Sequence, residues 1–187
     1  AIFKQKLVYP TGTDMVYSDL NFILLGMIIE KVDEESLDKS LKTHVFEPLE
    51  MNNTGYCLNE NKRNFVPTEK TDKRGLIQGE VHDETAYMLN GVSGNAGLFS
   101  TAEEVAQIYQ MLLNNGELNG KRYLSKETCK VFTTTVAKNS RRGLGFDKPD
   151  VQNPLKSPCA PSAPVSVYGH TGFTGTCAWV DPDNGLV

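Results

Sequence analysis

The chain has 187 residues, enough for one domain with a sizeable core, and 39% of them are apolar, which suits a globular protein rather than a disordered one. Lysine and arginine total 19 against 23 aspartates and glutamates, with no basic stripe, so nucleic acid is not expected as a partner. No apolar run approaches the ~20 residues of a membrane span. Residues 1–9 carry no signal-peptide pattern, so a targeting signal is not expected in this sequence.

Helical periodicity begins just after Tyr17. Apolar residues recur there at helical spacing, at Leu20, Ile23, Leu24, Met27 and Ile28. Ser18 or Asp19 is a competent N-cap for this helix. A second helix is predicted from about Ser36, with Pro48 closing it.

Residues 48–82 show no sustained period and are rich in Asn, Lys, Thr and Gly. We expect a long irregular segment there, followed by a short helix after Asp83. Such a segment in a compact domain is usually functional or mobile.

Regular structure resumes at Ser100. Two overlapping capping boxes start a helix there, Ser100 with Glu103 and Thr101 with Glu104. Gly116 ends this helix, and a shorter one is predicted from Ser125.

The last part of the chain changes from helical to strand patterns. Five prolines fall between Pro149 and Pro164, and strand alternation follows from Val165 to Trp179. Asp181–Gly185 is a turn sequence suited to a tight hairpin. Helices followed by antiparallel strands predict an α+β fold, with residues 1–146 mainly helical, 147–164 a Pro-rich loop and 165–187 strands.

Four cysteines are widely spaced, at Cys57, Cys129, Cys159 and Cys177. They form no CxxC pair and have no nearby histidine pair, so a structural zinc site is not indicated. Four cysteines allow three disulfide pairings, and unpaired small apolar residues are an equally good interpretation.

Three familiar motifs are excluded by their spacing. Gly91–Asn95 resembles a nucleophile elbow, but its second glycine directly follows the serine, whereas the motif places one residue between them. Gly143-Leu-Gly145 has no third glycine and follows no predicted strand, so it is not a dinucleotide site. The three histidines never form the paired spacing of a zinc-hydrolase helix, and no metal is expected.

The first pattern with chemical content is Tyr17-Ser18-Asp19, at the start of the first helix. Neighbouring cations in a cleft favour the phenolate form of a tyrosine, which can then carry a proton to or from a nucleophile. Taken alone, the tripeptide is better interpreted as a helix cap after a core aromatic residue.

The second pattern is His170-Thr171-Gly172, in the strand region. The glycines at positions 169, 172 and 175 would let a substrate backbone lie along the strand. His170 would supply a donor or partial positive charge, and the backbone N–H of Phe173 is a candidate oxyanion donor. The competing interpretation is a surface histidine in a glycine-rich hairpin.

Together and in this order, the two patterns resemble the serine β-lactamase and penicillin-binding-protein superfamily, whose motifs are Ser-x-x-Lys, then Tyr-x-Asn, then Lys-Thr-Gly or His-Thr-Gly. The resemblance runs from about Tyr9 to Pro182 and is nearest to the class-C-like branch of esterases, D-amino-acid peptidases and carboxypeptidases. It includes four phrases: Tyr17-Ser-Asp-Leu-Asn-Phe-Ile-Leu-Leu-Gly26, Phe46-Glu-Pro-Leu-Glu-Met51, Gly97-Leu-Phe-Ser-Thr101 and Gly169-His-Thr-Gly-Phe-Thr-Gly175.

The resemblance implies a role for each motif residue. Tyr17 would manage the proton of a serine nucleophile, His170 and Thr171 would orient the acyl group, and Gly172 and Phe173 would form the oxyanion side. Asp19 stands where the family has asparagine, which weakens a substrate-binding role at that position. His170 in place of lysine softens the case for binding a substrate carboxylate.

The serine nucleophile itself is missing from the expected place, since no serine precedes Tyr17. The one Ser-x-x-Lys, Ser36 to Lys39, follows the tyrosine motif in a highly charged stretch. A nucleophile helix must be buried so that its lysine is desolvated. We therefore interpret Ser36 as a helix cap and expect the family domain to be truncated at both ends, without activity of its own.

The function that the resemblance implies is a serine hydrolase acting through an acyl-enzyme in the parent protein. Its substrate would be a small ester or amide, or a peptidoglycan-derived peptide, and no cofactor is implied. We expect a periplasmic or extracellular location, self-association through an exposed strand edge, and a fused family-three glycosidase domain as in similar modules. A non-catalytic binding or regulatory module of a peptidoglycan-processing protein is the alternative. We expect Tyr17 and His170 to line one cleft.

Overall fold

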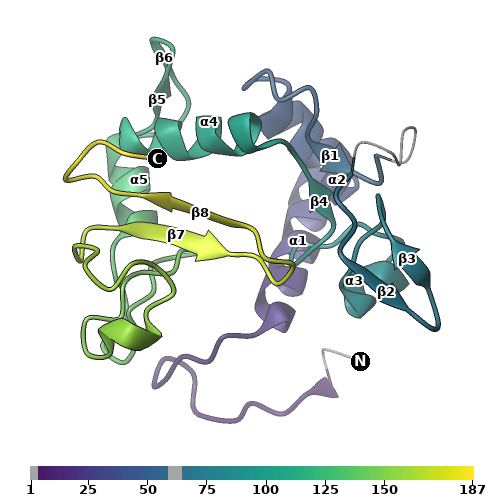
Figure 1. Ribbon diagram of the computed structural model, residues 1–187, viewed down its shortest axis with the longest axis horizontal. Coiled ribbons are helices and arrows are strands. Elements are labelled where there is room, and N and C mark those ends of the chain that lie inside the picture. Colours follow the sequence, from purple (N-terminus) through teal and green to yellow (C-terminus); the bar gives the residue numbers. More distant parts are fainter. Residues whose placement is uncertain (1–3, 59–64) are drawn as a thin grey trace. The chain divides into compact units, whose positions relative to one another are not determined.

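The computed structural model describes residues 4–58 and 65–187, which fold as two compact units (Figure 1). The first unit contains Lys4 and residues 17–104, and the second contains residues 5–16 and 105–187. Within the described ranges, no helix has both the length and the apolar character needed to cross a membrane.

The first unit combines short helices with two antiparallel strand pairs. Its elements are α1 (Asp19–Asp33), α2 (Leu37–Leu41), a π-helix (Lys42–Phe46), β1 (Gly55–Tyr56), β2 (Glu69–Thr71), β3 (Gly75–Ile77), α3 (Glu84–Met88) and β4 (Leu98–Phe99). Strand β1 pairs with β4, and β2 pairs with β3 as a hairpin. The buried apolar residues of this unit are Ile23, Leu37, Phe46, Leu49, Met51, Ile77, Val81 and Ala86.

The helices of this unit begin where the sequence predicts. Ser18 caps α1, its hydroxyl accepting a hydrogen bond from the backbone N–H of Leu20 at 3.3 Å. Ser36 precedes α2, and Asp83 caps α3. The second helix differs from expectation in one respect, because its last part, Lys42–Phe46, is a π-helix rather than α-helix.

The segment predicted as irregular, residues 48–82, is only partly so. Short strands β1, β2 and β3 form within it, while residues 59–64 lie outside the described part of the chain. Strands β1, β2 and β3 have two or three residues each, which is too short for a period of two to stand out in the sequence.

Helix α4 (Ala102–Leu113) begins in the first unit and continues in the second. The Thr101 hydroxyl accepts a hydrogen bond from the backbone N–H of Glu104 at 3.3 Å, which is half of the predicted capping box. The side chain of Glu104 instead bonds to Asn53 and Thr54. A tertiary contact has replaced the reciprocal local bond.

The second unit consists of helices and two antiparallel hairpins. After α4 its elements are β5 (Glu117–Leu118), β6 (Lys121–Arg122), α5 (Lys126–Thr133), a 3₁₀ turn (Pro154–Lys156), β7 (Tyr168–Thr171) and β8 (Cys177–Val180). Ser125 caps α5 as predicted, accepting from the N–H of Thr128 at 3.0 Å. Its buried apolar residues are Met111, Leu112, Leu118, Cys129, Val167, Tyr168 and Val180.

Strands β7 and β8 position the His-Thr-Gly pattern. Gly169 lies opposite Trp179 and His170 opposite Ala178. On its other side, Gly169 exchanges two backbone hydrogen bonds with Asp147, of 2.7 and 3.0 Å. The region predicted as one alternating strand is thus a hairpin, and Phe173 lies in its turn, 93% exposed.

The turn after β8 also differs from the tight hairpin expected. Asp181 and Leu186 exchange two backbone hydrogen bonds, which leaves a four-residue loop between them. The Asp181 carboxylate accepts bonds from the N–H groups of Asp183 and Asn184 and so stabilises this longer loop. Mixed helices and antiparallel strands confirm the α+β class.

Candidate active site

The Tyr17-Ser18-Asp19 pattern lies at the amino end of α1. Ser18 is the cap, Asp19 is the first helical residue, and Tyr17 directly precedes them with 53% of its surface exposed. The Ser18 cap fixes where the helix begins and thereby the backbone position of Tyr17, the residue before the cap. The carboxylate of Asp19 stands in the first turn, where a negative charge is favourable for the helix dipole.

Helix α1 is held by the segment that resembles a nucleophile elbow. A Cβ at Gly94 would lie 2.0 Å from the carbonyl oxygen of Phe22, so only glycine lets the two backbones approach this closely. Ser93 is 5% exposed, and its hydroxyl bonds to Asn95 at 2.7 Å. The Tyr56 hydroxyl donates to the Ser93 carbonyl at 3.0 Å, and burial raises the pKa of Tyr56 to about 12. The segment therefore supports α1, in agreement with its exclusion as a nucleophile elbow.

The His170-Thr171-Gly172 pattern occupies the end of β7 and the start of the hairpin turn. His170 is half-buried, whereas Thr171, Gly172 and Phe173 are exposed. The N–H of Gly172 donates to the carbonyl of Thr176 at 2.6 Å and closes the turn. Thr171 and the backbone of Phe173 are therefore presented at an accessible edge.

The glycines of this strand have a different explanation from the one expected. A Cβ at Gly169 would lie 2.2 Å from the carbonyl oxygen of Ala178, and one at Gly172 would lie 2.2 Å from the Thr176 hydroxyl oxygen. Gly175 has a φ of +94°, which belongs to the turn. The hairpin itself requires these glycines, and the space next to Gly169 and Gly172 is filled by β8 and the turn rather than left for a substrate.

Next to this strand lies an ionic cluster that the sequence analysis missed. Asp147 is 3% exposed, and its carboxylate binds Arg141 Nε at 2.7 Å and Arg142 Nη2 at 2.8 Å. The hydrogen bond from Arg141 to Asp147 raises the pKa of the Arg141 guanidinium. Two adjacent arginines before an aspartate were visible in the sequence, but they match no motif and could not be linked to His170 without the fold.

Lys148 stabilises the loop that contains this cluster by hydrogen bonds to three backbone carbonyl groups. Its ammonium group lies 3.2 Å from the Thr133 carbonyl oxygen, 3.2 Å from that of Val167 and 3.4 Å from that of Ser166. Burial lowers the pKa of Lys148. Burial also raises the pKa of the neighbouring Tyr168 phenol to about 12, so Tyr168 stays protonated near neutral pH. The Lys148 ammonium group joins the end of α5 to the segment that leads into β7.

Ser36 has the surroundings predicted for a residue outside the active site. It precedes α2, is exposed and makes no side-chain cap bond, and Lys39 is exposed as well. Nothing desolvates this lysine within the described part of the chain, so the pair lacks the burial that activates a serine nucleophile.

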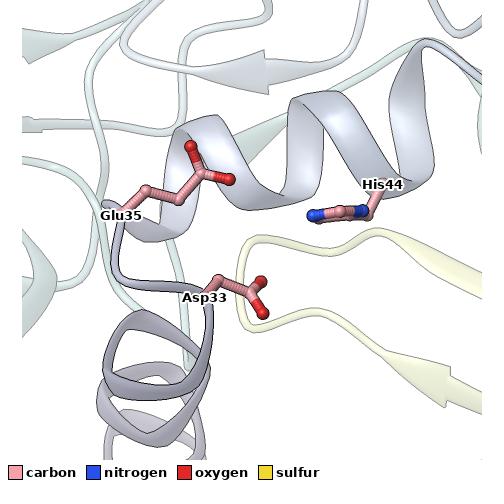
Figure 2. A group of neighbouring side chains, drawn as sticks. All are labelled: Asp33, Glu35 and His44. Carbon is pink, nitrogen blue, oxygen red and sulfur yellow. The ribbon is translucent and has the colours of Figure 1, made fainter.

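One cluster in the first unit has residue types that metals bind. The cluster consists of Asp33 at the end of α1, Glu35 before α2 and His44 in the π-helix (Figure 2). Two carboxylates and an imidazole lie there within 4.8 Å of one another. Asp33 and His44 are exposed, and the Asp33 carboxylate accepts a hydrogen bond from Ser40. The hydrogen bond from Ser40 already gives the Asp33 carboxylate a partner within the protein, and we assign the cluster no role.

The predicted site residues fall in both units. Tyr17 and Asp19 belong to the first, and His170, Thr171, Gly172 and Phe173 belong to the second. Each set is ordered by its own contacts, and the expectation that Tyr17 and His170 line one cleft stays a prediction. The four cysteines, whose pairing the sequence left open, are free thiols.

The fold of this chain is that of the serine β-lactamases and penicillin-binding proteins. A penicillin-binding protein homologue from Caulobacter crescentus superposes with a TM-score of 0.64 at 20% identity, covering 95% of this chain and 52% of that one. Similarity at this level of identity concerns the fold alone.

The chain belongs to the beta-lactamase family, because the family's sequence profile matches residues 1–187. A Bacillus subtilis (strain 168) protein named N-acetylmuramyl-L-alanine amidase is 35% identical over 96% of this chain and 44% of its own length. An Escherichia coli (strain K12) protein with the provisional name D-alanyl-D-alanine carboxypeptidase is 33% identical over 98% of this chain and 46% of its own length. The chain thus spans less than half the length of these two relatives.

Proposed function

We propose that these residues form the part of a serine hydrolase site that follows the nucleophile in sequence, and that the enzyme acts through an acyl-enzyme. The observation that carries the proposal is the pair of motifs. Tyr17-Ser18-Asp19 opens α1 and His170-Thr171-Gly172 ends β7, in the superfamily's order, within a chain that the family profile matches from residue 1 to residue 187. Functional side chains are usually held at such element ends by a rigid scaffold.

The proposed reaction assigns each motif one task. A serine outside this sequence attacks an ester or amide carbonyl, and its proton passes through Tyr17 and a lysine near that serine to the leaving group. The backbone N–H of Phe173 and that of the serine hold the oxyanion, while Thr171 orients the acyl group. Water then attacks the acyl-enzyme, which releases the acid and restores the serine.

We place the nucleophile outside these residues because Ser36 does not have the burial that a nucleophile needs. It is the only serine here with a lysine three residues on, and both residues are exposed. The two relatives are more than twice as long as the matched region, which leaves room for a Ser-x-x-Lys segment. The proposal requires Tyr17 and His170 to face one substrate in the longer protein.

The proposed substrate is a peptidoglycan-derived peptide or amide. The names of the two relatives refer to an amidase and to a carboxypeptidase for D-alanyl-D-alanine ends, which supports this class. Such a substrate implies a periplasmic or extracellular location. A fused glycosidase domain that acts on cell-wall sugars would suit the same role.

The test is covalent labelling with a fluorescent penicillin and an activated ester. The 187-residue chain and a version extended upstream to include Ser-x-x-Lys are incubated separately and analysed by mass spectrometry. We expect stoichiometric label on the upstream serine of the extended protein and none on the chain alone. Label on Ser36 would contradict the proposal. If neither protein is labelled and neither hydrolyses a D-alanyl-D-alanine peptide, the proposal fails and a binding module is favoured.

A further inference from the structure

The imidazole of His170 lies between a group that can only donate a hydrogen bond and a group that can only accept one. Its Nε2 lies 3.0 Å from Nη1 of Arg142, and its Nδ1 lies 2.7 Å from the carbonyl oxygen of Thr171. A guanidinium nitrogen can only donate a hydrogen bond, and a carbonyl oxygen can only accept one. Nε2 must therefore be the acceptor, and Nδ1 must carry the proton. This pair of contacts selects the neutral Nδ1–H tautomer.

Arg142 is itself held by Asp147. Its Nη2 donates to Oδ2 of Asp147 at 2.8 Å, while its Nη1 faces His170. One planar guanidinium thus spans the carboxylate and the imidazole, a geometry that the single ammonium of a lysine cannot reproduce. Asp147 is 3% exposed, so solvent screens this pair less than it would a surface ion pair.

The aspartate is anchored to the same strand as the histidine. The backbone of Asp147 exchanges hydrogen bonds of 2.7 and 3.0 Å with Gly169, the residue before His170. Its carboxylate also accepts bonds from Arg141, at 2.7 Å to Nε and 2.9 Å to Nη2. Backbone and side chain therefore fix the distance from Asp147 to His170, with Arg142 filling the space between them.

We propose that Arg142 is a positioning residue for His170, held in place by Asp147, and that it fixes both the ring orientation and the Nδ1–H tautomer. The Arg142 guanidinium then lies directly against Nε2 of His170, and the Thr171 carbonyl accepts the proton on Nδ1. The tautomer follows from contacts within the second unit alone. The consequence for catalysis rests on the proposed hydrolase function.

The direct test is nitrogen NMR on the 187-residue chain with ¹⁵N-labelled histidine. The His170 signals are assigned by their loss in His170→Asn, which separates them from those of His44 and His82. We expect a pyridine-like shift at Nε2 and a pyrrole-like shift at Nδ1 at neutral pH. A proton on Nε2 of the unmodified chain would overturn the proposal without any need for a variant.

The variant test removes the arginine. Arg142→Ala removes the contact that requires an unprotonated Nε2, so we expect the Nε2 signal of His170 to move away from its pyridine-like shift. Arg122→Ala is the control, because Arg122 bonds to Glu117 and to backbone carbonyls and contacts neither Asp147 nor His170. An unchanged His170 tautomer in a folded Arg142→Ala chain would refute the positioning role. Trp179 fluorescence, from the strand next to β7, reports whether each variant is folded.

The catalytic consequence is measured separately, in the extended protein. Misplacement of a substrate-positioning group by about 1 Å can lower the rate about 10²-fold, so we expect a loss of this size in kcat/KM for Arg142→Ala and none for Arg122→Ala. An unchanged kcat/KM would overturn this consequence. Failure of the extended protein to label at all would instead overturn the proposed function, while the NMR result would still decide whether Arg142 fixes His170.

Discussion

Glu104, in the first turn of α4, accepts hydrogen bonds from both the backbone and the side chain of Asn53. The backbone N–H of Asn53 lies 2.9 Å from Oε1 and 3.1 Å from Oε2, and its side-chain amide nitrogen lies 2.8 Å from Oε1. Thr54 donates to the same carboxylate. Glu104 is 6% exposed, so this buried charge joins the start of α4 to the loop before β1.

Replacing Glu104 by glutamine should destabilise the chain in a pH-dependent manner. Burial alone would raise the pKa of Glu104, but the hydrogen bonds from Thr54 and Asn53 outweigh it and lower the pKa below its ordinary value. A group with a lowered folded-state pKa stabilises fully above its unfolded pKa, about 4.3, and loses that contribution as the pH falls through the folded value. We expect the free energy of unfolding, measured with urea at neutral pH, to fall by roughly 1–3 kcal/mol.

The control for this experiment is Glu103→Gln, which removes an exposed charge from the same helical turn. Its effect should be within about 0.5 kcal/mol. The difference between Glu104→Gln and the unmodified chain should shrink as the pH is lowered below 4.3, roughly the unfolded pKa. A difference that is the same at acidic and neutral pH would show that the carboxylate charge is not the stabilising feature.

Gly94→Ala should displace α1. The added methyl group would lie 2.0 Å from the Phe22 carbonyl oxygen, which is backbone and cannot rotate away. We expect destabilisation of about 1–3 kcal/mol or more, measured by thermal unfolding. In the comparison variant Gly55→Ala, the new group meets only the flexible end of Leu58 at 3.1 Å, so its effect should be smaller. Equal effects of the two substitutions would contradict close packing at Gly94.

Lys148→Met should loosen the loop beside β7. The substitution keeps an apolar stem but removes the donor shared by the Thr133, Ser166 and Val167 carbonyls. An unsatisfied buried acceptor costs about 1–3 kcal/mol, and we expect a loss in this range. Hydrogen exchange should rise at the β7 amides first. Lys138→Met, at an exposed position, serves as the control, and similar exchange in both variants would argue against the role of Lys148.

Tyr17→Phe should reduce catalysis by the extended protein without disturbing its fold. The ring is kept and only the hydroxyl that we propose as proton carrier is lost, so we expect kcat to fall by about 10²–10⁴ with little change in KM. Tyr87→Phe is a matched control, because its ring, on which Arg74 stacks at 4.0 Å, is also kept. Full activity of Tyr17→Phe would remove Tyr17 from the mechanism.

The chain should associate with itself through β8. In the described residues, β8 pairs only with β7, which leaves its other edge available for backbone hydrogen bonds. We expect dimers or larger species by light scattering. A stable monomer at high protein concentration would contradict this prediction.

The amino-acid sequence determined the local features of this protein. The beginnings of α1, α3 and α5 follow from Ser18, Asp83 and Ser125, because a capping side chain bonds to backbone groups two or three residues away. The family and the two motifs were also readable, since both are short and keep their order. The exclusion of Ser36 depended on local charge, which predicted its exposure correctly.

Only the tertiary structure decided which distant residues meet. Glu104 was predicted to bond within its own helix, but its partner is Asn53, and no local pattern indicates a contact across 51 positions. Arg142 and His170 are 28 positions apart and match no shared motif. Side-chain hydrogen bonds depend on where the folded backbone places donors and acceptors, and that placement results from packing of the whole unit rather than from any single segment. The sequence likewise predicted substrate beside Gly169 and Gly172, because β8 and the turn residue Thr176, which fill the space next to them, are brought there only by folding.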